Sequence, residues 1–477
     1  MKADRIPENN EKSLRELLFD SSDFKSTNFS SGERLYRLFY LDTIIESKII
    51  QEHIIRPLLH NVNNASVRES VSILDYSETN LLSDAAKGLV EGKTVLQING
   101  ESILYLLGTE LIAERSINIP INERAFRGSS KALNENLSTN INMMRKMIES
   151  PDLVVKYYQI GRRSNSTVAV LYLSSLANEV VLAEFDRRLK SIDVDYIESP
   201  GFVDELLEKS TFSIFPKILV TERPDRIRSY LMDGKIAFLT EGSPDGLIVP
   251  VSFWAFFQSP DDYQINWLIG STLRFLRIIC FILAFSLPGI YVALVTFDPR
   301  IIPFSIALTL QSSMQYVALP PVLEALSMLA ILEILREAAV RLPNPIGNTI
   351  GVVGGIIIGT VVVQSNLISN MMVIIVALTG VSSFIIPSYE MSSSARLLTY
   401  PFIFIAATFG LLGLVISYLL VLTHLARLDT MGIPYFYNWF NGDTIKDTIF
   451  RLPIRYLKKR PMESLAKDDT RMKAPRG

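Results

Sequence analysis

Charged side chains almost disappear from one long stretch of this 477-residue chain. Residues 278–426 contain nine acidic or basic side chains, although the whole chain has 47 Lys or Arg and 49 Asp or Glu. The longest uncharged run, residues 342–389, has 48 residues. A helix needs only about 20 apolar residues to cross the hydrocarbon core of a bilayer. The sequence therefore predicts a soluble portion followed by an α-helical, polytopic membrane domain.

The soluble portion begins with a polar stretch. Residues 1–30 offer few apolar side chains to bury, so we expect a mobile leader without a fold. From residue 34 the run RLYRLFYLDTIIESKIIQEHIIRPLL has helical periodicity, and KTVLQINGESILYLLG predicts two strands around the turn Asn99-Gly100. A helix over 131–148 should end before Pro151, which disfavours helix at its predecessor. We therefore predict a small α/β subdomain over 31–150.

A second α/β subdomain is predicted over residues 151–265. TVAVLYL is typical of a buried strand, EVVLAEFDRRLKSI and GFVDELLEK of amphipathic helices, and KILVTE, DRIRSYLMDG and KIAFLTEGS of strand, helix and strand. This order predicts a mixed sheet covered by helices. No secretory signal peptide precedes the soluble portion, so we expect it to stay in the cytoplasm.

Signs of catalysis are missing from the sequence. No phosphate-binding G-x-x-x-x-G-K-[ST] motif lies between a strand and a helix. The three histidines, His53, His60 and His424, are too scattered for a catalytic set, and the single cysteine, Cys280, excludes an internal disulfide. We expect no enzyme activity, no cofactor, no metal site and no nucleic-acid partner.

The membrane domain is predicted over residues 274–426. Arg274 and Arg277 precede a first crossing over 278–297, and a proline-broken apolar region and three further apolar segments follow it. A basic tail, residues 427–477, contains eleven Lys or Arg against six acids. The positive-inside bias then places both termini in the cytoplasm, with four or six full crossings. The tail either contacts anionic lipid headgroups or only sets the topology.

Four glycines recur at four-residue spacing in the middle of this domain: Gly347, Gly351, Gly355 and Gly359. They form a stripe along one helix face, where two backbones can approach closely in lipid. The stripe either packs on another helix of the same chain or surrounds an oligomeric pore. The polar residues that follow, Gln364, Ser365 and Asn366, either line a water-filled vestibule or face the aqueous interface.

Intramembrane carboxylates are the other unusual feature of this half. Glu333 can pair with Arg336 three residues away, and Glu337 with Arg341 four residues away. Glu324 has no such local partner and lies among apolar residues. We therefore name Glu324 as the candidate for an ion pathway or an interhelix contact.

Several runs of the sequence resemble a known family, the A subunits of the GerA-type spore germinant receptors. The resemblance rests on GKIAFLTEGSPDGLIVPVSFWAFFQSPDDY, on LRFLR, on LEILREAAVRLPNPIG with VVGGIIIG, and on RLYRLFYLD. In RAFRGSSKALNENLSTNINMMRKMIESPDL the residues Arg127, Gly128, Asn140 and Arg145 fit the family pattern, whereas Ser129, Ser130, Lys131 and Leu133 depart from it.

The resemblance implies a receptor subunit in the inner membrane of a bacterial spore. It implies two partners, a transporter-like B subunit and a lipoprotein C subunit, and a cytoplasmic region of two α/β subdomains. It also implies that the chain oligomerises, as a pentamer, into a nutrient-gated channel that releases monovalent cations. Arg274 and Arg277 would then couple the soluble part to the channel.

Two rival classes of protein stay open from the residues alone. A secondary transporter would use broken helices and intramembrane charge such as Glu324 to bind a solute at the bilayer midplane. A membrane-anchored scaffold would use the helices only to hold the α/β domains at the surface. The glycine stripe favours assembly in either case.

Overall fold

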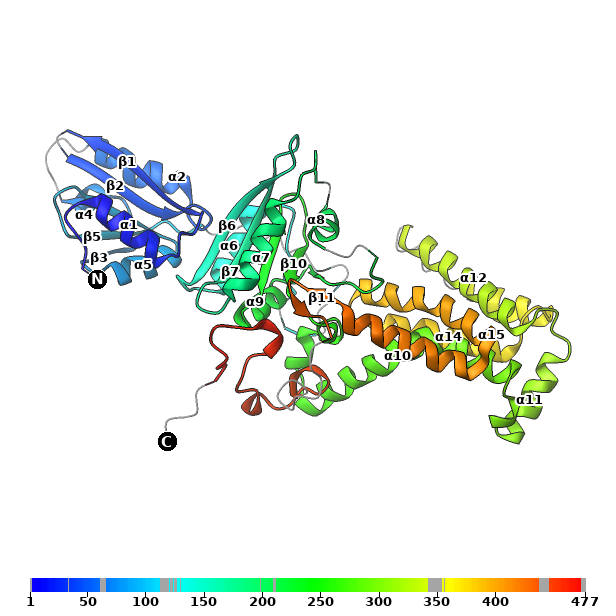
Figure 1. Cartoon of the computed structure of the whole chain (residues 1–477). Coiled ribbons are helices and arrows are strands. Elements are labelled where there is room, and N and C mark those ends of the chain that lie inside the picture. The colour runs from blue at the N-terminus through cyan, green and yellow to red at the C-terminus, as the bar shows by residue number, and fades with distance from the viewer. Residues whose placement is uncertain are drawn as a thin grey trace.

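The computed structural model describes residues 2–32, 34–60, 66–111, 120, 123, 127–128, 130–197, 199–208, 212–341, 354–355, 357–436 and 446–472. Two α/β domains lie in line, and a bundle of helices extends from the second (Figure 1). The predicted fold class, two small α/β units followed by apolar helices, is confirmed.

The first domain is built on a five-stranded antiparallel sheet of order β1-β2-β4-β5-β3. Side chains alternate along the strands, so Phe39 faces one layer of helices and Leu38 the other. The strands are β1 (Phe24–Ser31), β2 (Arg34–Leu41), β3 (Tyr76–Thr79), β4 (Lys93–Ile98) and β5 (Leu104–Gly108). One face is covered by α1 (Pro7–Leu17) and α5 (Leu82–Val90), the other by α2 (Ser47–Ile49), the π-helical turn η1 (Ile50–Ile55), α3 (Arg56–His60) and α4 (Val67–Ser70).

Two expectations for this domain are wrong. The supposed leader contains helix α1 and the paired edge strand β1, because Leu14 and Leu18 supply enough apolar surface to complete the core. The run RLYRLFYL is strand β2 rather than helix, because it is paired on both sides, with β1 and β4, and its alternate residues bury in the two opposite layers. The predicted strand, turn and strand around Asn99-Gly100 are confirmed as β4 and β5.

The second domain repeats the same architecture. Its five strands are antiparallel in the order β6-β7-β9-β10-β8. This is the order of the first sheet with five added to each strand number. The strands are β6 (Leu153–Ile160), β7 (Ser166–Leu173), β8 (Leu219–Thr221), β9 (Ile236–Thr240) and β10 (Gly246–Val249). One face is covered by α7 (Glu179–Lys190) and α8 (Pro200–Leu207), the other by α6 (Leu137–Met147) and α9 (Pro224–Met232).

The boundary between the two domains lies earlier in the chain than predicted, because helix α6 belongs to the second domain. Its apolar side chains Leu137, Ile141 and Met144 lie in the core of the second sheet, together with Ile227 of α9. The second domain therefore begins before α6 and not near residue 150. Pro151 ends the helix as predicted, but the chain then continues within the same domain as β6.

The two domains share details that only a structural repeat explains. In α1 the side chain of Asn10 both accepts from the backbone N–H of Asp4, at 2.7 Å, and donates to its carbonyl, at 2.7 Å. In α6 Asn140 makes the same pair of bonds to Asn134, six residues earlier, at 2.8 and 2.6 Å. Residues 89–100, LVEGKTVLQING, also match residues 231–242, LMDGKIAFLTEG, and the glycine after the helix has φ +88° in both.

A buried ion pair joins the two domains. Arg145 of α6 donates to both carboxylate oxygens of Asp23, at 3.0 and 2.8 Å, and the two side chains are fully buried. The same guanidinium donates to Ser21 and to the carbonyl of Leu153. Because Asp23 directly precedes β1 and Arg145 belongs to the second domain, this contact fixes the two sheets relative to each other.

The helical half starts directly from the second domain. It comprises α10 (Trp267–Thr296), α11 (Phe304–Met314), α12 (Pro321–Arg341), a helical segment that includes the π-helical turn η5 (Ile357–Val362), α14 (Asn370–Phe384) and α15 (Tyr389–Arg427). Within the described residues, α10 and α15 are long and apolar enough to cross a membrane.

Helix α15 is a hairpin of two arms rather than one rod. Gly410 has φ +61° and ψ −147°, which is not helical. The rings of Phe402 and Tyr418 are 5.2 Å apart, whereas sixteen residues of straight helix would separate them by about 24 Å. Gly410 also lies against Phe297 at the far end of α10. The chain therefore runs out along α15, turns at Gly410 and returns.

Helices α12 and α14 run in the same direction along the bundle. We call the end next to the second domain the foot and the opposite end the far end. α12 starts at the far end, where Glu324 contacts Ser369, and approaches the foot, where Arg336 contacts Ser383. α14 follows the same direction, because Ser369 caps its start. Both arms of α15 reach the foot, where Ser394 donates to the carbonyl of Ile214.

Replacing Asp23 with Ala should destabilise the soluble half. The substitution leaves the Arg145 guanidinium buried without its carboxylate, which costs about 3 kcal/mol or more and should lower the Tm by roughly 6 °C or more. Circular dichroism of the full chain in detergent measures the change. Asp193→Ala is the matched control, because its partner Arg162 is 66% exposed and such pairs contribute little. Equal Tm values for the two variants would contradict the assignment.

Candidate functional site

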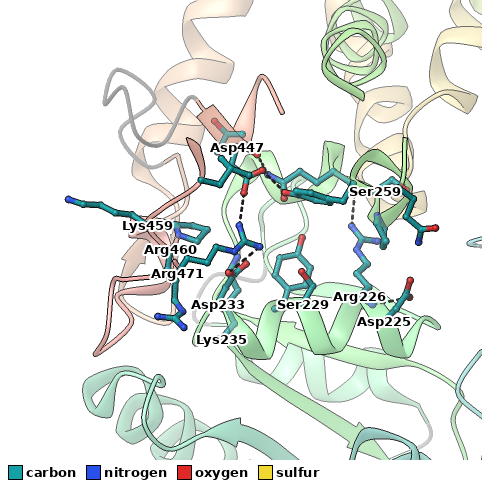
Figure 2. A pocket seen from close by; sticks show the side chains of 18 residues that line it. Asp225, Arg226, Ser229, Asp233, Lys235, Ser259, Asp447, Lys459, Arg460 and Arg471 are labelled. Carbon is teal, nitrogen blue, oxygen red and sulfur yellow. Dashed lines mark hydrogen bonds and ion pairs between the residues drawn. The ribbon is translucent and has the colours of Figure 1, made fainter. Parts of the chain in front are cut away.

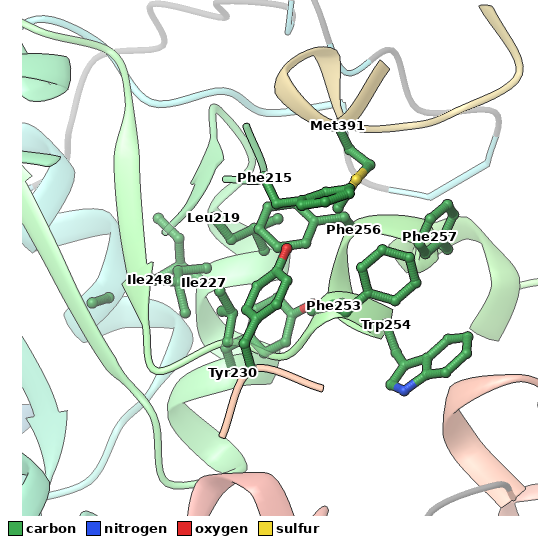
Figure 3. Close-up of a cluster of buried hydrophobic side chains, with 14 of the residues drawn as sticks. Phe215, Leu219, Ile227, Tyr230, Ile248, Phe253, Trp254, Phe256, Phe257 and Met391 are labelled. Atoms are coloured by element: carbon green, nitrogen blue, oxygen red, sulfur yellow. The ribbon is translucent and has the colours of Figure 1, made fainter. Parts of the chain in front are cut away.

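An aromatic segment connects the second domain to the helices. Residues 253–257, FWAFF, form a short 3-10 helix, η2 (Phe253–Phe257), in which every side chain is buried. Phe253 contacts Phe215 of the domain, at 6.2 Å between ring centroids, and Phe281 of α10, at 5.7 Å. Figure 3 shows this cluster with Met391 of α15 against it. One hydrophobic core therefore runs without a break from the second sheet into the bundle.

A single carboxylate anchors the start of α10. Asp262 lies in the 3-10 turn η3 (Pro260–Tyr263) and is completely buried. Arg277 donates to both of its oxygens, at 2.8 Å each, and Arg274 donates to one, at 3.3 Å. Gly270 allows this approach, because a Cβ there would lie 2.8 Å from the Asp262 carbonyl. The two arginines named from the sequence therefore share one partner at the junction.

The C-terminal tail completes this junction. Arg274 also donates to the carbonyl of Asp447, and the Tyr263 hydroxyl donates to the Asp447 carboxylate. Ser271 of α10 exchanges hydrogen bonds with the backbone of Arg451, at 2.8 and 3.1 Å. Arg274 itself is 0% exposed. The start of α10 is thus enclosed between η3 on one side and the tail on the other.

Beyond the junction the tail returns to the second domain. Lys235 and Glu463 form a buried ion pair at 2.7 Å, and Lys467 pairs with Glu179 at 2.9 Å. Arg460 donates to the carbonyl of Met232. Several basic side chains of the tail therefore have protein partners. From the sequence we expected the tail to contact lipid headgroups or only to set the topology, and we did not predict that it docks on the second domain.

A polar cavity of about 340 Å³ lies between α9, η3 and the tail. Figure 2 shows Arg471 of the tail between Asp233 and Asp447, with ion-pair distances of 3.8 and 3.3 Å. Burial raises the pKa of Asp233 to about 6, although Arg471 and Lys235 lower it. The tail forms one wall of this cavity. Access of solvent or a ligand to the cavity therefore depends on how the tail is docked.

Carboxylates gather where α8 meets the foot of α15. Asp204, Glu208 and Glu390 line one open cleft, and Lys217 pairs with Glu208 at 2.8 Å. Burial and repulsion from Glu390 and Glu208 raise the pKa of Asp204 to about 8. Asp204 therefore stays protonated at neutral pH, which removes one negative charge from this contact.

Glu324 lies at the far end of the bundle and is fully buried. One of its oxygens accepts from the backbone N–H of Ser369, at 3.0 Å, and from its hydroxyl, at 2.8 Å. Its other oxygen has no hydrogen-bond partner among the described residues. Within one chain Glu324 thus joins the start of α12 to the start of α14, and it does not approach Arg274 or Arg277.

The glycine stripe is described only in part. Gly347 and Gly351 lie outside the described residues, and Gly359 lies in η5. Gly355 is exposed, and a Cβ there would have no neighbour within 4 Å. The close contact with α12 is made instead by Gly354, where a Cβ would lie 2.7 Å from Leu335.

The polar residues after the stripe lie at the far end of the bundle. Gln364, Ser365 and Asn366 are exposed. Ser365 donates to the carbonyl of Val361, and Asn366 accepts from the backbone of Ala318. The predicted pairs Glu333–Arg336 and Glu337–Arg341 are confirmed at 2.8 and 2.6 Å.

Sequence reasoning missed Asp262, Asp447 and Glu463. These carboxylates lie far apart in the chain, and each would pass for an ordinary surface acid. The position of Asp262 could have indicated its role from the sequence. It follows the apolar FWAFF run, and only four residues separate it from α10.

Comparison with known proteins gives consistent similarities along the whole chain. Residues 12–463 match the family described as Bacillus/Clostridium GerA spore germination protein. Spore germination protein B1 of Bacillus subtilis is 34% identical over 99% of this chain and 100% of its own length. Spore germination protein A1 of the same organism is 36% identical over 91% and 90%. Spore germination protein GerLA of Bacillus cereus is 33% identical over 90% and 89%.

One solved structure is also similar in sequence. The N-terminal domain of the A subunit of the Bacillus megaterium spore germinant receptor GerK3 is 27% identical. It covers 53% of this chain and 98% of its own, with a TM-score of 0.43.

Replacing Asp262 with Ala should loosen the junction, because the buried Arg274 and the partly buried Arg277 then lose their shared carboxylate. We expect the tail of the full chain in detergent to be cleaved by trypsin at least about tenfold faster, since roughly 3 kcal/mol of docking energy is lost. Asp262→Ala with Arg274→Met should recover part of the protection, because one buried charge is removed. Asp193→Ala is the control, because it removes an exposed carboxylate of the second domain whose partner Arg162 is 66% exposed. Unchanged cleavage in Asp262→Ala would contradict the clamp.

Asp204 predicts a pH dependence of stability. Its pKa is higher in the folded protein than in the unfolded chain, so the folded state keeps the proton between about pH 4 and pH 8 while the unfolded state releases it. Stability should therefore fall as the pH rises through this window and level off above it. In Asp204→Asn the fall in stability should be smaller than in wild type, because Asp233 still contributes to it, as unfolding of the full chain measured from pH 5 to pH 9 would report. Identical profiles would refute the assignment.

Proposed function

We propose, for this member of the GerA spore germination protein family, that it is the A subunit of a nutrient receptor and forms an ion channel. The chain belongs to that family by its family match and by its relatives. The proposed complex contains a transporter-like B subunit and a lipoprotein C subunit in the spore inner membrane. Several copies of this chain, five by family resemblance, surround the pore, and opening releases monovalent cations.

Chain direction supports a multi-pass topology. α10 leads away from the second domain, and both arms of α15 reach the foot again. The tail then docks on the same domain from which α10 departs. An even number of crossings, six when every traverse of the bundle spans, places both termini in the cytoplasm. The buried foot of α10 limits how deeply the bundle can enter the bilayer.

Exposed small and polar residues support a pore between copies. The described part of the segment 354–364 exposes Gly355, Thr360 and Gln364, together with the apolar Val361. Uncharged polar groups facing hydrocarbon are costly, and a water-filled path between subunits relieves that cost. Gly355 leaves room for a second helix to approach. The interior of one bundle, by contrast, is packed with apolar side chains.

The junction supports gating by the soluble domains. Asp262 holds Arg274 and Arg277 of α10, and the second domain shares one core with the bundle. A displacement of that domain therefore moves the foot of α10 directly. This contact is the observation that carries the proposal, because it gives the cytoplasmic half a rigid connection to a helix next to the pore.

Ion release from liposomes tests the channel. The chain, alone and with both partner subunits and a nutrient, is reconstituted into vesicles loaded with potassium. We expect flux from wild type and its loss or alteration in Gly355→Leu, because a large side chain fills the intersubunit face. Thr408→Leu, an equally exposed small-to-large change on α15, should conduct normally.

Three other outcomes would contradict a pore at this face. Equal flux from Gly355→Leu and wild type would remove the segment from the pore. Absence of flux under every condition would favour a scaffold. Solute uptake that is lost in Glu324→Gln, without ion leak, would favour a transporter, because that carboxylate would then carry the coupling charge.

A further inference from the structure

A second cavity lies at the foot of α15, where the returning arm meets the second domain. Its volume is about 190 Å³, and it is enclosed by α7, the start of β8 and the strand β11 (Asp429–Thr430). Four basic side chains line it: Arg188, Lys217, His424 and Arg427. It is separate from the junction around Asp262 and from the cavity of Figure 2.

One donor of Arg188 has no acceptor among the residues that the structure describes. Its Nε donates to Glu184 at 2.8 Å and its Nη1 to the carbonyl of Leu207 at 3.0 Å. Its Nη2 is buried and has no hydrogen-bond acceptor among the described residues. The side chain is only 7% exposed. A buried N–H without an acceptor is costly, so this donor indicates that a ligand oxygen completes the site.

Two of the cations at the cavity are paired with carboxylates, and Arg188 is held by Glu184 through its Nε. Lys217, 5% exposed, pairs with Glu208 at 2.8 Å. Asp429 lines the rim and is exposed. Arg427 is also exposed, and no carboxylate of the described residues lies within ion-pair distance of it in this structure. Three formal cations, Arg188, Lys217 and Arg427, therefore meet three carboxylates, Glu184, Glu208 and Asp429. The Arg188 Nη2, the Arg427 guanidinium and the His424 ring remain as donors at the cavity.

The helix that carries this rim continues as an apolar surface. Ile416, Leu420, His424 and Arg427 follow one another at spacings of four, four and three residues, which places them on one face of the returning arm. Ile416 is 46% exposed and Leu420 is 60% exposed. The same face therefore changes from apolar to basic at the foot of the bundle, next to the cavity.

We propose that this cavity binds a phosphate group, of the kind that a phospholipid headgroup or free phosphate supplies. Arg188 Nη2 and Lys217 hold the oxyanion from within, and His424 and Arg427 hold it at the mouth. A phospholipid would lay an acyl chain along Ile416 and Leu420. This lipid source rests on the proposed placement of the bundle in a bilayer, but it does not require that the chain conducts ions.

Binding measurements on the full chain in neutral detergent test the proposal. Phosphatidylglycerol, diacylglycerol and inorganic phosphate are titrated separately, and the rise in Tm gives an apparent Kd for each. The main variant is Arg427→Gln with His424→Gln, because both side chains lie at the mouth. Arg188→Met is the second variant. Arg187→Gln, which removes the neighbouring charge on the exposed side of α7, is the control.

Wild type and Arg187→Gln should bind phosphatidylglycerol or phosphate, and the double variant should bind it about tenfold or more weakly, because charge-assisted hydrogen bonds are lost. Binding of phosphatidylglycerol but not of free phosphate identifies a headgroup. Comparable binding of inorganic phosphate identifies a soluble anion. The proposal is overturned if diacylglycerol binds as tightly as phosphatidylglycerol, or if the double variant binds like wild type. Potassium flux measured on the same proteins separates this result from failure of the channel.

Discussion

The buried carboxylate of Asp262 is the contact on which the arrangement of the two halves depends. It is fully buried and accepts hydrogen bonds from both Arg277 and Arg274, so removing this carboxylate would leave two guanidinium groups without their shared partner. A buried ion pair contributes little net stability over an apolar replacement, but it allows only one geometry. The junction therefore specifies how α10 leaves the second domain. The tail adds Asp447, which ties the same arginine to the last part of the chain.

The two soluble domains have the same strand order but different attachments. The second domain shares its hydrophobic core with the bundle through FWAFF, so the two move as one unit. The first domain has its own two cores and is joined through the buried pair of Arg145 and Asp23. A partner that binds the first domain would therefore act on the helices only through the second.

Patterns within short stretches of sequence predicted many of the helices and strands of this protein. The features that they did not predict depend on contacts between residues far apart in the chain. The apolar run TVAVLYL predicts a buried strand, and the charge-free stretch beyond residue 278 predicts membrane helices. Both predictions need only residues that are neighbours in the sequence. Strand β2 was mistaken for helix because its apolar residues bury on both faces, a fact that depends on its neighbours in the sheet. The repeat was readable in LVEGKTVLQING and LMDGKIAFLTEG, but the duplicated domains have otherwise diverged. The partners of Arg274 and Arg277 were not readable, because Asp447 lies 173 residues from Arg274.

The pairing of Lys235 with Glu463 has a consequence for how the protein is made. The two residues are 228 positions apart, and Lys235 is 1% exposed. While the ribosome still holds the end of the chain, Lys235 lacks its carboxylate partner, although all the strands of both five-stranded sheets have already been made. Folding of the second domain therefore finishes only after the helices have been synthesised and the tail has been released. A chain truncated before the tail would keep an incomplete second domain and would be recognisable to proteases. The pair of Lys235 and Glu463 is therefore among the last contacts of the second domain to form.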